Sequence, residues 1–170
     1  AIIIQKVFKL KTFAVDINLA SNKIPRIKNL HFQKQDLMNL DFEDNTFSLI
    51  YNIHVLEHVS DHIKVLNEFY RVLKKNGVLY IGFPNKNRLI GYIGSHNKIS
   101  LFEKIQWNFV DYLNRLKGKF ENKYGAHAGF TQKEFIEDAS KIFRKVHKVR
   151  NDYMLVKYSK YKIIIRLIIL

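Results

Sequence analysis

The 170-residue sequence contains no cysteine. Disulfide bonds, thiolate metal sites and cysteine nucleophiles are therefore excluded. Nowhere does the sequence reach the roughly 20 consecutive apolar residues that a membrane-spanning helix needs. Its first residues also lack the leading charge and the small-residue cleavage site of a secretory signal. We therefore expect a cytoplasmic protein without a transmembrane segment.

The longest apolar run, residues 163–170, has eight residues and is interrupted by Arg166. We interpret it as a buried strand. The alternative is the start of a helix that lies on a membrane.

Positive charge is concentrated in the second half of the sequence. The whole chain carries a net charge of +14, and residues 85–170 hold 18 Lys/Arg against 7 Asp/Glu. Such a field favours an anionic partner: a phosphorylated or carboxylated substrate, a nucleic acid or a lipid surface. A lysine-rich proteome would produce the same excess without any such partner.

With 47% hydrophobic residues, the chain can bury the core of one domain. Its first half alternates apolar runs with helical spacing, which predicts an α/β fold with a mostly parallel, doubly wound sheet covered by helices on both faces. Helices are expected over residues 2–11 and 59–73, the second closed by Lys74–Gly77. Strands are expected over residues 13–17, 30–36, 47–52 and 78–83.

The alternation stops after residue 85. We expect residues 1–85 to form a cofactor-binding half and residues 86–126 an inserted basic and aromatic cap, with a helix at 101–116 and turns at Gly91, Gly94 and Gly118. Residues 127–170 should form a C-terminal helix and strands. Thr131 and Glu134 form the capping box of that helix, and 146–149 and 154–158 are the expected strands.

Two acidic residues end successive predicted strands, namely Asp16 and Asp36. Ligands of open parallel sheets bind outside the carboxyl ends of the strands. Asp16 could accept hydrogen bonds from a ribose diol. Asp36 could accept from an adenine amino group while the N–H of Leu37 meets a ring nitrogen. Either acid alone is also typical of a helix cap or a turn.

Three ordered segments carry a family resemblance. Residues 36–50 (DLMNLDFEDNTFSLI) resemble the pattern D-x-x-x-L-P-F-x-D-x-S-F-D-x-V of methyltransferases. Residues 54–59 (HVLEHV) and 71–79 (RVLKKNGVL) resemble the "VLEHV" and "R-V-L-K-P-G-G-x-L" segments, and residues 127–135 (HAGFTQKEF) match more loosely. The chain thus resembles the class I, Rossmann-like S-adenosylmethionine-dependent methyltransferases, in particular the group acting on small molecules and lipid intermediates.

This resemblance implies S-adenosyl-L-methionine as cofactor, with Asp16, Ile17, Asp36, Leu37 and Asn52 beside it. It also implies a small-molecule acceptor, anionic or lipid-linked, with the cap as its lid. The family's glycine-rich motif D-x-G-x-G-x-G is absent, as is the strand before it, which would lie between the strands ending at Asp16 and Asn52. We therefore expect a fragment that holds the adenosine-binding half of the site, a degraded relative being the alternative.

Three histidines are candidate catalytic bases: His54, His58 and His127. His58 lies in the segment that faces the reactive end of the cofactor in the family, and His127 is expected where the cap returns to the domain, so these two are our predicted catalytic residues. A purely structural role is the alternative for each. His54 and His58 could share one helical face, but with no third ligand we predict no metal site.

Aromatic and basic residues alternate in the cap: Trp107, Phe109, Tyr112 and Phe120 with Arg115, Lys117 and Lys119. These aromatic residues could stack on bases or line an acceptor pocket, but we favour a stripe that packs on the domain below. Two other functions therefore stay open: an RNA methyltransferase or basic nucleic-acid-binding protein, and a non-catalytic remnant. The sequence gives no oligomeric state and allows a peripheral membrane contact.

Overall fold

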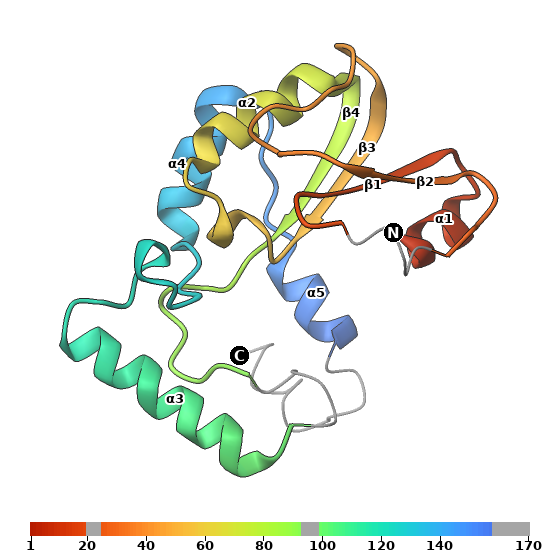
Figure 1. Cartoon of the computed structure of the whole chain (residues 1–170). Helices are drawn as coiled ribbons and strands as arrows, with labels where there is room; N and C mark the ends of the chain where they lie inside the picture. Colours follow the sequence, from red (N-terminus) through yellow and green to blue (C-terminus); the bar gives the residue numbers. More distant parts are fainter. Residues whose placement is uncertain (20–24, 93–98, 158–170) are drawn as a thin grey trace.

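The chain combines parallel strands with helices, as predicted (Figure 1). The computed structural model describes residues 1–19, 25–92 and 99–157. In chain order the elements are α1 (Ile2–Phe8), β1 (Thr12–Asp16), β2 (Leu30–Lys34), β3 (Phe47–Ile53), the 3₁₀ helix η2 (Leu56–His58), α2 (His62–Val72), β4 (Leu73–Gly82), α3 (Leu101–Leu116), the 3₁₀ helix η3 (Asn122–Tyr124), α4 (Gln132–Ile142) and α5 (Arg150–Lys157).

The strands form two parallel pairs. β1 pairs with β2, from Thr12 opposite Leu30 to Asp16 opposite Lys34, and β3 pairs with β4. Within the described residues β1 and β3 are not hydrogen-bonded to each other, and the two ribbons diverge in Figure 1. The fold is α/β and Rossmann-like.

The core lies between the β3–β4 pair and helices α2 and α4. Val65, Leu66 and Phe69 of α2 are fully or almost fully buried and pack with Phe135 of α4. Strand alternation points Leu79 of β4 into this core. On the opposite face of the sheet, Tyr80 stacks on Tyr51 of β3 at 5.3 Å between ring centroids.

Helix α2 is shorter than predicted at both ends. It begins after Asp61, whose side chain accepts a hydrogen bond from the Lys64 N–H, and it ends at Val72. The expected glycine stop at Gly77 is wrong. Instead, the chain passes directly into β4, whose register against β3 shifts at an irregularity between Phe47 and Leu49, and Asn76 takes the left-handed conformation (φ 65°). Gly77 is needed for a different reason, since a Cβ there would lie 2.8 Å from the Leu73 side chain.

The strands predicted near the C-terminus are wrong. Residues 146–149 form no regular element, and residues 150–157 form helix α5. Apolar residues such as Met154 and Val156 had suggested a strand. The segment begins with polar residues, however, and Asp152 in the first turn favours a helix through its interaction with the helix dipole. Tyr158, the run 163–170 and Gly94 lie outside the described residues.

Helix α3 has the predicted bounds, with Ser100 and Glu103 forming a capping box. The expectation that its aromatic stripe packs on the domain is wrong for Phe109 and Tyr112, which are 63% and 60% exposed. Phe120, beyond the helix, is buried beneath the guanidinium groups of Arg88 and Arg115. In the part of the chain that the structure describes, no helix is long and apolar enough to cross a membrane.

Candidate active site

The candidate site lies at the carboxyl ends of the strands, which parallel pairing brings to the same edge of each pair. Asp16 is the last residue of β1, and Asp36 follows β2 by two residues. Asn52 is the penultimate residue of β3. The backbone N–H of His54 donates to the carbonyl of Gly82 at 2.8 Å, which joins the ends of β3 and β4.

Each of the two predicted acids forms a turn. Asp16 Oδ1 accepts a hydrogen bond from the N–H of Asn18 at 2.7 Å, and Asp36 Oδ1 accepts from the N–H of Met38 at 2.9 Å. These bonds confirm the turn role that either acid alone suggested. For both carboxylates, Oδ2 has no hydrogen-bond partner within the described residues. The turn fixes each side chain while leaving an acceptor oxygen available.

The two neighbours named with these acids lie in different surroundings. Ile17 is 54% exposed directly after β1. The side chain of Leu37 packs against the hydrophobic core, which fixes the backbone next to Asp36.

Two buried oxygens at the end of β3 lack hydrogen-bond donors. Asn52 and Glu57 are 6% and 3% exposed, and Asn52 Oδ1 and Glu57 Oε2 have no partner within the described residues. A buried polar atom without a partner costs about 1–3 kcal/mol. Such atoms in a native fold call for an explanation, and a bound donor would supply one.

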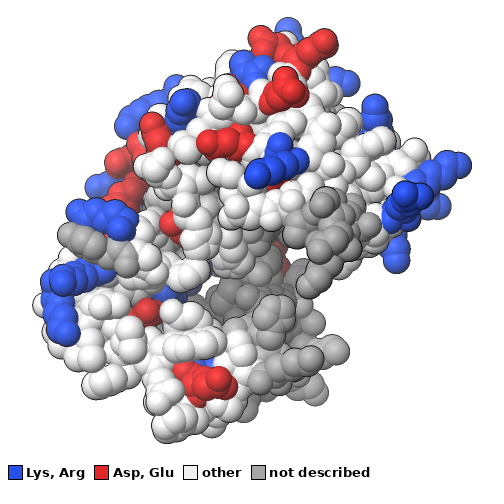
Figure 2. Space-filling model, in the orientation of Figure 1, with Lys and Arg blue, Asp and Glu red and all other residues white. Residues whose placement is uncertain are grey.

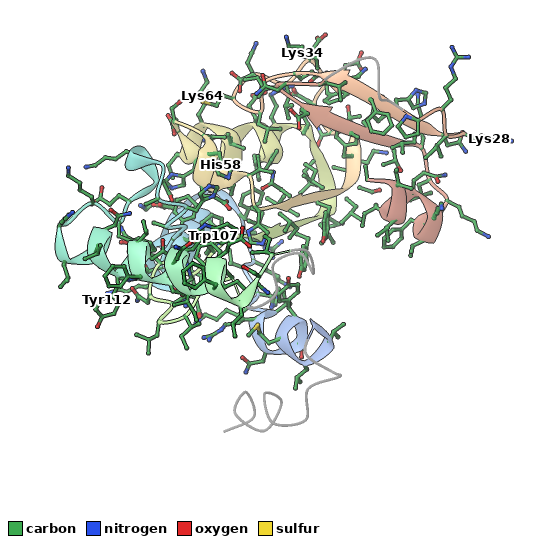
Figure 3. All side chains as sticks on the ribbon, turned by 60° about the horizontal axis from the view of Figure 1, so that its bottom comes forward. Lys28, Lys34, His58, Lys64, Trp107 and Tyr112 are labelled. Carbon is green, nitrogen blue, oxygen red and sulfur yellow. The ribbon has the colours of Figure 1, made fainter. Side chains whose placement is uncertain are left out.

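Two of the three candidate histidines are in contact. The rings of His58 (labelled in Figure 3) and His127 meet edge-to-face with centroids 4.5 Å apart, although the residues are 69 positions apart in the sequence. Both residues are exposed. The structure therefore brings together the two predicted catalytic residues at an accessible position.

We had considered that His54 and His58 could share one helical face, but the structure does not place them on one. His54 precedes η2 in the left-handed conformation (φ 54°), and its Nδ1 lies 3.4 Å from Glu57 Oε1. Within the described residues, no group of three or more His, Cys, Asp or Glu side chains could hold a metal ion.

The close packing of Gly129 on Pro84 brings His127 to His58. Gly129 has a φ of 76°, and a Cβ there would lie 1.7 Å from the Pro84 carbonyl oxygen. The N–H of Phe130 donates to this oxygen at 3.1 Å, while the Asn122 side chain accepts from the Gly129 N–H and donates to its carbonyl. His127 itself is left-handed (φ 44°). Backbone strain of this kind is held in place by its surroundings and is frequent at functional sites.

Arg71 fixes the loop that follows Asp36. Its guanidinium donates to the carbonyl oxygens of Leu40 (2.8 Å) and Phe42 (2.7 Å) and to Asp44 (2.9 Å). It also forms two hydrogen bonds with Glu68, which in turn accepts from the Leu40 N–H. These contacts lower the pKa of Glu68 and raise that of Arg71. We did not predict this role from the sequence, although a basic residue three positions after an acidic one on a helix was a signal for it.

Comparisons with known proteins show which proteins this chain resembles. Residues 3–81 match the family described as "Methyltransferase domain". An uncharacterised protein of Methanocaldococcus jannaschii is 43% identical over 81 residues, which are 46% of this chain and 34% of that protein. A ubiquinone/menaquinone biosynthesis C-methyltransferase of Campylobacter jejuni is 28% identical over 121 residues, 71% of this chain and 50% of that protein.

The fold also matches a solved structure. An S-adenosylmethionine-dependent methyltransferase of Thermotoga maritima superimposes with a TM-score of 0.53 at 20% identity, covering 81% of this chain and 56% of that one. The chain thus spans about half, or less, of the length of these relatives. Residues 3–81 are thus similar to a methyltransferase domain, and the fold of the chain is similar to the Rossmann-like fold of a solved S-adenosylmethionine-dependent methyltransferase.

Proposed function

We propose that this chain holds the adenosine side of an S-adenosylmethionine site and takes part in methyl transfer to a small-molecule or lipid-linked acceptor. The observation that carries the proposal is a pair of buried oxygens that accept no hydrogen bond within the described residues. Asn52 Oδ1 lies near the end of β3, and Glu57 Oε2 belongs to η2, which also contains His58. A buried acceptor without a partner is explained by a ligand that brings N–H or cationic groups.

The residues along the strand ends fit this cofactor. Asp16 and Asp36 each offer one carboxylate oxygen, for the ribose hydroxyls and the adenine amino group respectively. The N–H of Leu37 would meet an adenine ring nitrogen, and the exposed Ile17 side chain would cover an apolar face of the nucleoside. Asn52 and Glu57 would accept from the remaining polar groups.

His58 and His127 are proposed to act on the acceptor. Bound S-adenosylmethionine supplies a methyl group on a sulfonium, which leaves by in-line displacement, so positioning provides much of the rate. An acceptor that loses a proton needs a base, and a neutral imidazole nitrogen can hold that proton near pH 7. One imidazole would hold the proton, and the edge-to-face contact with the other would fix the orientation of its ring.

The names of the relatives support the proposed acceptor class. The Campylobacter relative acts in ubiquinone/menaquinone biosynthesis, and other relatives are named sterol 24-C-methyltransferases. We infer a similarly apolar acceptor here.

Calorimetric titration with S-adenosylhomocysteine tests the cofactor site. We expect saturable binding, and we expect Asp16→Asn and Asp36→Asn each to weaken it about tenfold, since each removes a charged hydrogen-bond acceptor. Asp41→Asn is the matched control: Asp41 is an exposed acid in the same segment, and its carboxylate forms no hydrogen bond within the described residues, so its removal should leave the affinity unchanged.

Two results would contradict the proposal. One is the absence of any heat up to millimolar ligand, which would favour the non-catalytic remnant. The other is an equal loss of affinity in all three variants, which would indicate a general charge effect and not two defined contacts.

A further inference from the structure

Helix α3 presents its apolar face to solvent and its polar face to the domain. Six side chains share a sector of about 100° around the helix axis, and they are between 58% and 75% exposed: Leu101, Phe102, Ile105, Phe109, Tyr112 and Leu116. Figure 3 shows Tyr112 at the outer margin of the molecule. In an ordinary surface helix this stripe would be buried in the core.

Specific polar contacts hold the helix in this orientation. The buried Asp111 accepts from Arg88 at 2.9 Å and from the Tyr92 hydroxyl at 3.2 Å. Asn108 accepts from the Gly91 N–H at 2.7 Å, and Arg115 donates to the Arg88 carbonyl at 2.8 Å. These bonds involve side chains that lie beside the apolar stripe, outside its sector. Turning the stripe inward would break all of them, so the exposure is built into the fold.

The exposed surface continues beyond the helix. Leu89 and Ile90, in the segment that Asn108 holds through Gly91, are 89% and 65% exposed. In Figure 2 the surface over α3 is mostly white, that is, neither basic nor acidic. Many large apolar side chains exposed in one region of the surface mark an interaction site.

The charge of the chain distinguishes between two possible partners of the α3 surface, a second copy of the chain and a lipid surface. Residues 85–170 hold 18 Lys/Arg against 7 Asp/Glu, and the exposed Lys117 and Lys119 directly follow the helix. The six-residue stripe contains no charged side chain, and Glu103 is turned to its capping partner Ser100. Two copies of this positively charged half of the chain would repel each other, whereas an anionic lipid surface would attract it.

We propose that α3 is a membrane-surface helix, which lies in the headgroup region of an anionic bilayer with its six-residue apolar stripe towards the acyl chains. Its 16 residues span about 24 Å, less than the roughly 30 Å hydrocarbon core, so the helix lies along the surface. Burial of the stripe together with lysine attraction to anionic lipid provides the binding free energy. This inference is independent of the proposed methyl transfer.

Vesicle co-sedimentation tests the proposal. We expect the protein to bind vesicles of phosphatidylcholine with one quarter phosphatidylglycerol, and to bind pure phosphatidylcholine much more weakly. The double variant Phe102→Ser/Phe109→Ser should lower the partition coefficient at least tenfold, because two large apolar side chains no longer enter the lipid. Lys117→Glu/Lys119→Glu should weaken binding to anionic vesicles alone.

A matched control is Val7→Ser on α1, which is 66% exposed and lies far from α3 in both ribbon views (Figures 1 and 3). It should leave vesicle binding unchanged. Circular dichroism checks that each variant is folded, as expected for exposed positions.

Depth can be measured on the helix itself. The chain has one tryptophan, Trp107, which is 38% exposed beside Tyr92. In a Trp107→Phe/Tyr112→Trp variant, the new indole lies on the apolar stripe, and brominated acyl chains should quench its fluorescence. The proposal is overturned if neither vesicle binds, if the Phe102→Ser/Phe109→Ser variant binds equally well, or if light scattering finds a dimer that this variant abolishes while vesicles do not bind.

Discussion

At the scale of single residues, two side chains explain how the candidate site is assembled. Arg71 joins the carbonyl groups of the loop after β2 to α2, and Gly129 lets the chain touch Pro84 so that His127 meets His58. Neither residue is a proposed ligand contact. Each of them fixes the backbone of a segment that carries a proposed ligand contact.

Gly129→Ala should destabilise the fold by about 3 kcal/mol or more, because the new Cβ must displace the backbone of Pro84 in addition to adopting a positive φ. Gly125→Ala separates these two causes. Gly125 has a similar φ of 72°, but nothing lies within 4 Å of the position that a Cβ would take there, so its cost should be only about 1 kcal/mol. Urea denaturation measures both, and equal costs would refute the role of the Pro84 contact.

At the scale of elements, helix ends decide where the chain enters and leaves the site. The capping box of α4 links Thr131 and Glu134 in both directions, with the hydroxyl accepting from the Glu134 N–H and the carboxylate accepting from the Thr131 N–H. The cap residue Thr131 follows His127 closely in the chain. The first turn of α4 therefore contributes to the position of the histidine pair.

Thr131→Ala should cost about 1 kcal/mol of folding stability, since it leaves a first-turn N–H without its acceptor. Thr131→Ser keeps the hydroxyl and should restore most of the loss. Chemical denaturation of the two variants side by side provides the measurement. A serine variant as unstable as the alanine variant would show that the methyl group, and not the cap, matters.

At the scale of the whole molecule, carboxylates held by hydrogen bonds link stability to pH. Five of them have a pKa below its usual value: Glu68, Glu103, Glu121, Glu134 and Asp138. For Glu68 the main cause is the hydrogen bond from Arg71. A lowered pKa in the folded state adds stability above the unfolded value near 4.5, and this stability is lost as pH falls through the folded value.

The free energy of unfolding should therefore be steady near neutral pH and fall below about pH 4.5. Glu68→Gln should lower stability at pH 7 by on the order of 1 kcal/mol and show a smaller further loss on acidification, because one linked group is gone. Glu43→Gln is the control, since the exposed Glu43 side chain forms no hydrogen bond within the described residues. Parallel acid profiles for the two variants would argue against the Arg71–Glu68 linkage.

The sequence by itself determined the order of the elements from α1 to α4 and the resemblance to methyltransferases. Apolar periodicity placed the first four strands and helices α1, α2, α3 and α4, because burial on a sheet face or a helix stripe dictates the spacing of apolar residues. Three ordered segments indicated the resemblance to methyltransferases. The predicted cofactor role of Asp16, which ends β1, and of Asp36, which follows β2, came from the rule that ligands bind at strand ends. The cofactor residues remain a prediction until they are tested.

The tertiary structure alone decided what depends on contacts between distant residues. The contact between His58 and His127 depends on Gly129, because a Cβ there would collide with Pro84. The unpaired oxygens of Asn52 and Glu57 depend on the burial of the β3 end. The outward apolar face of α3 could not be predicted either, because helical periodicity gives the direction of a stripe relative to the helix but not to the domain. The buried Asp111–Arg88 pair fixes that direction.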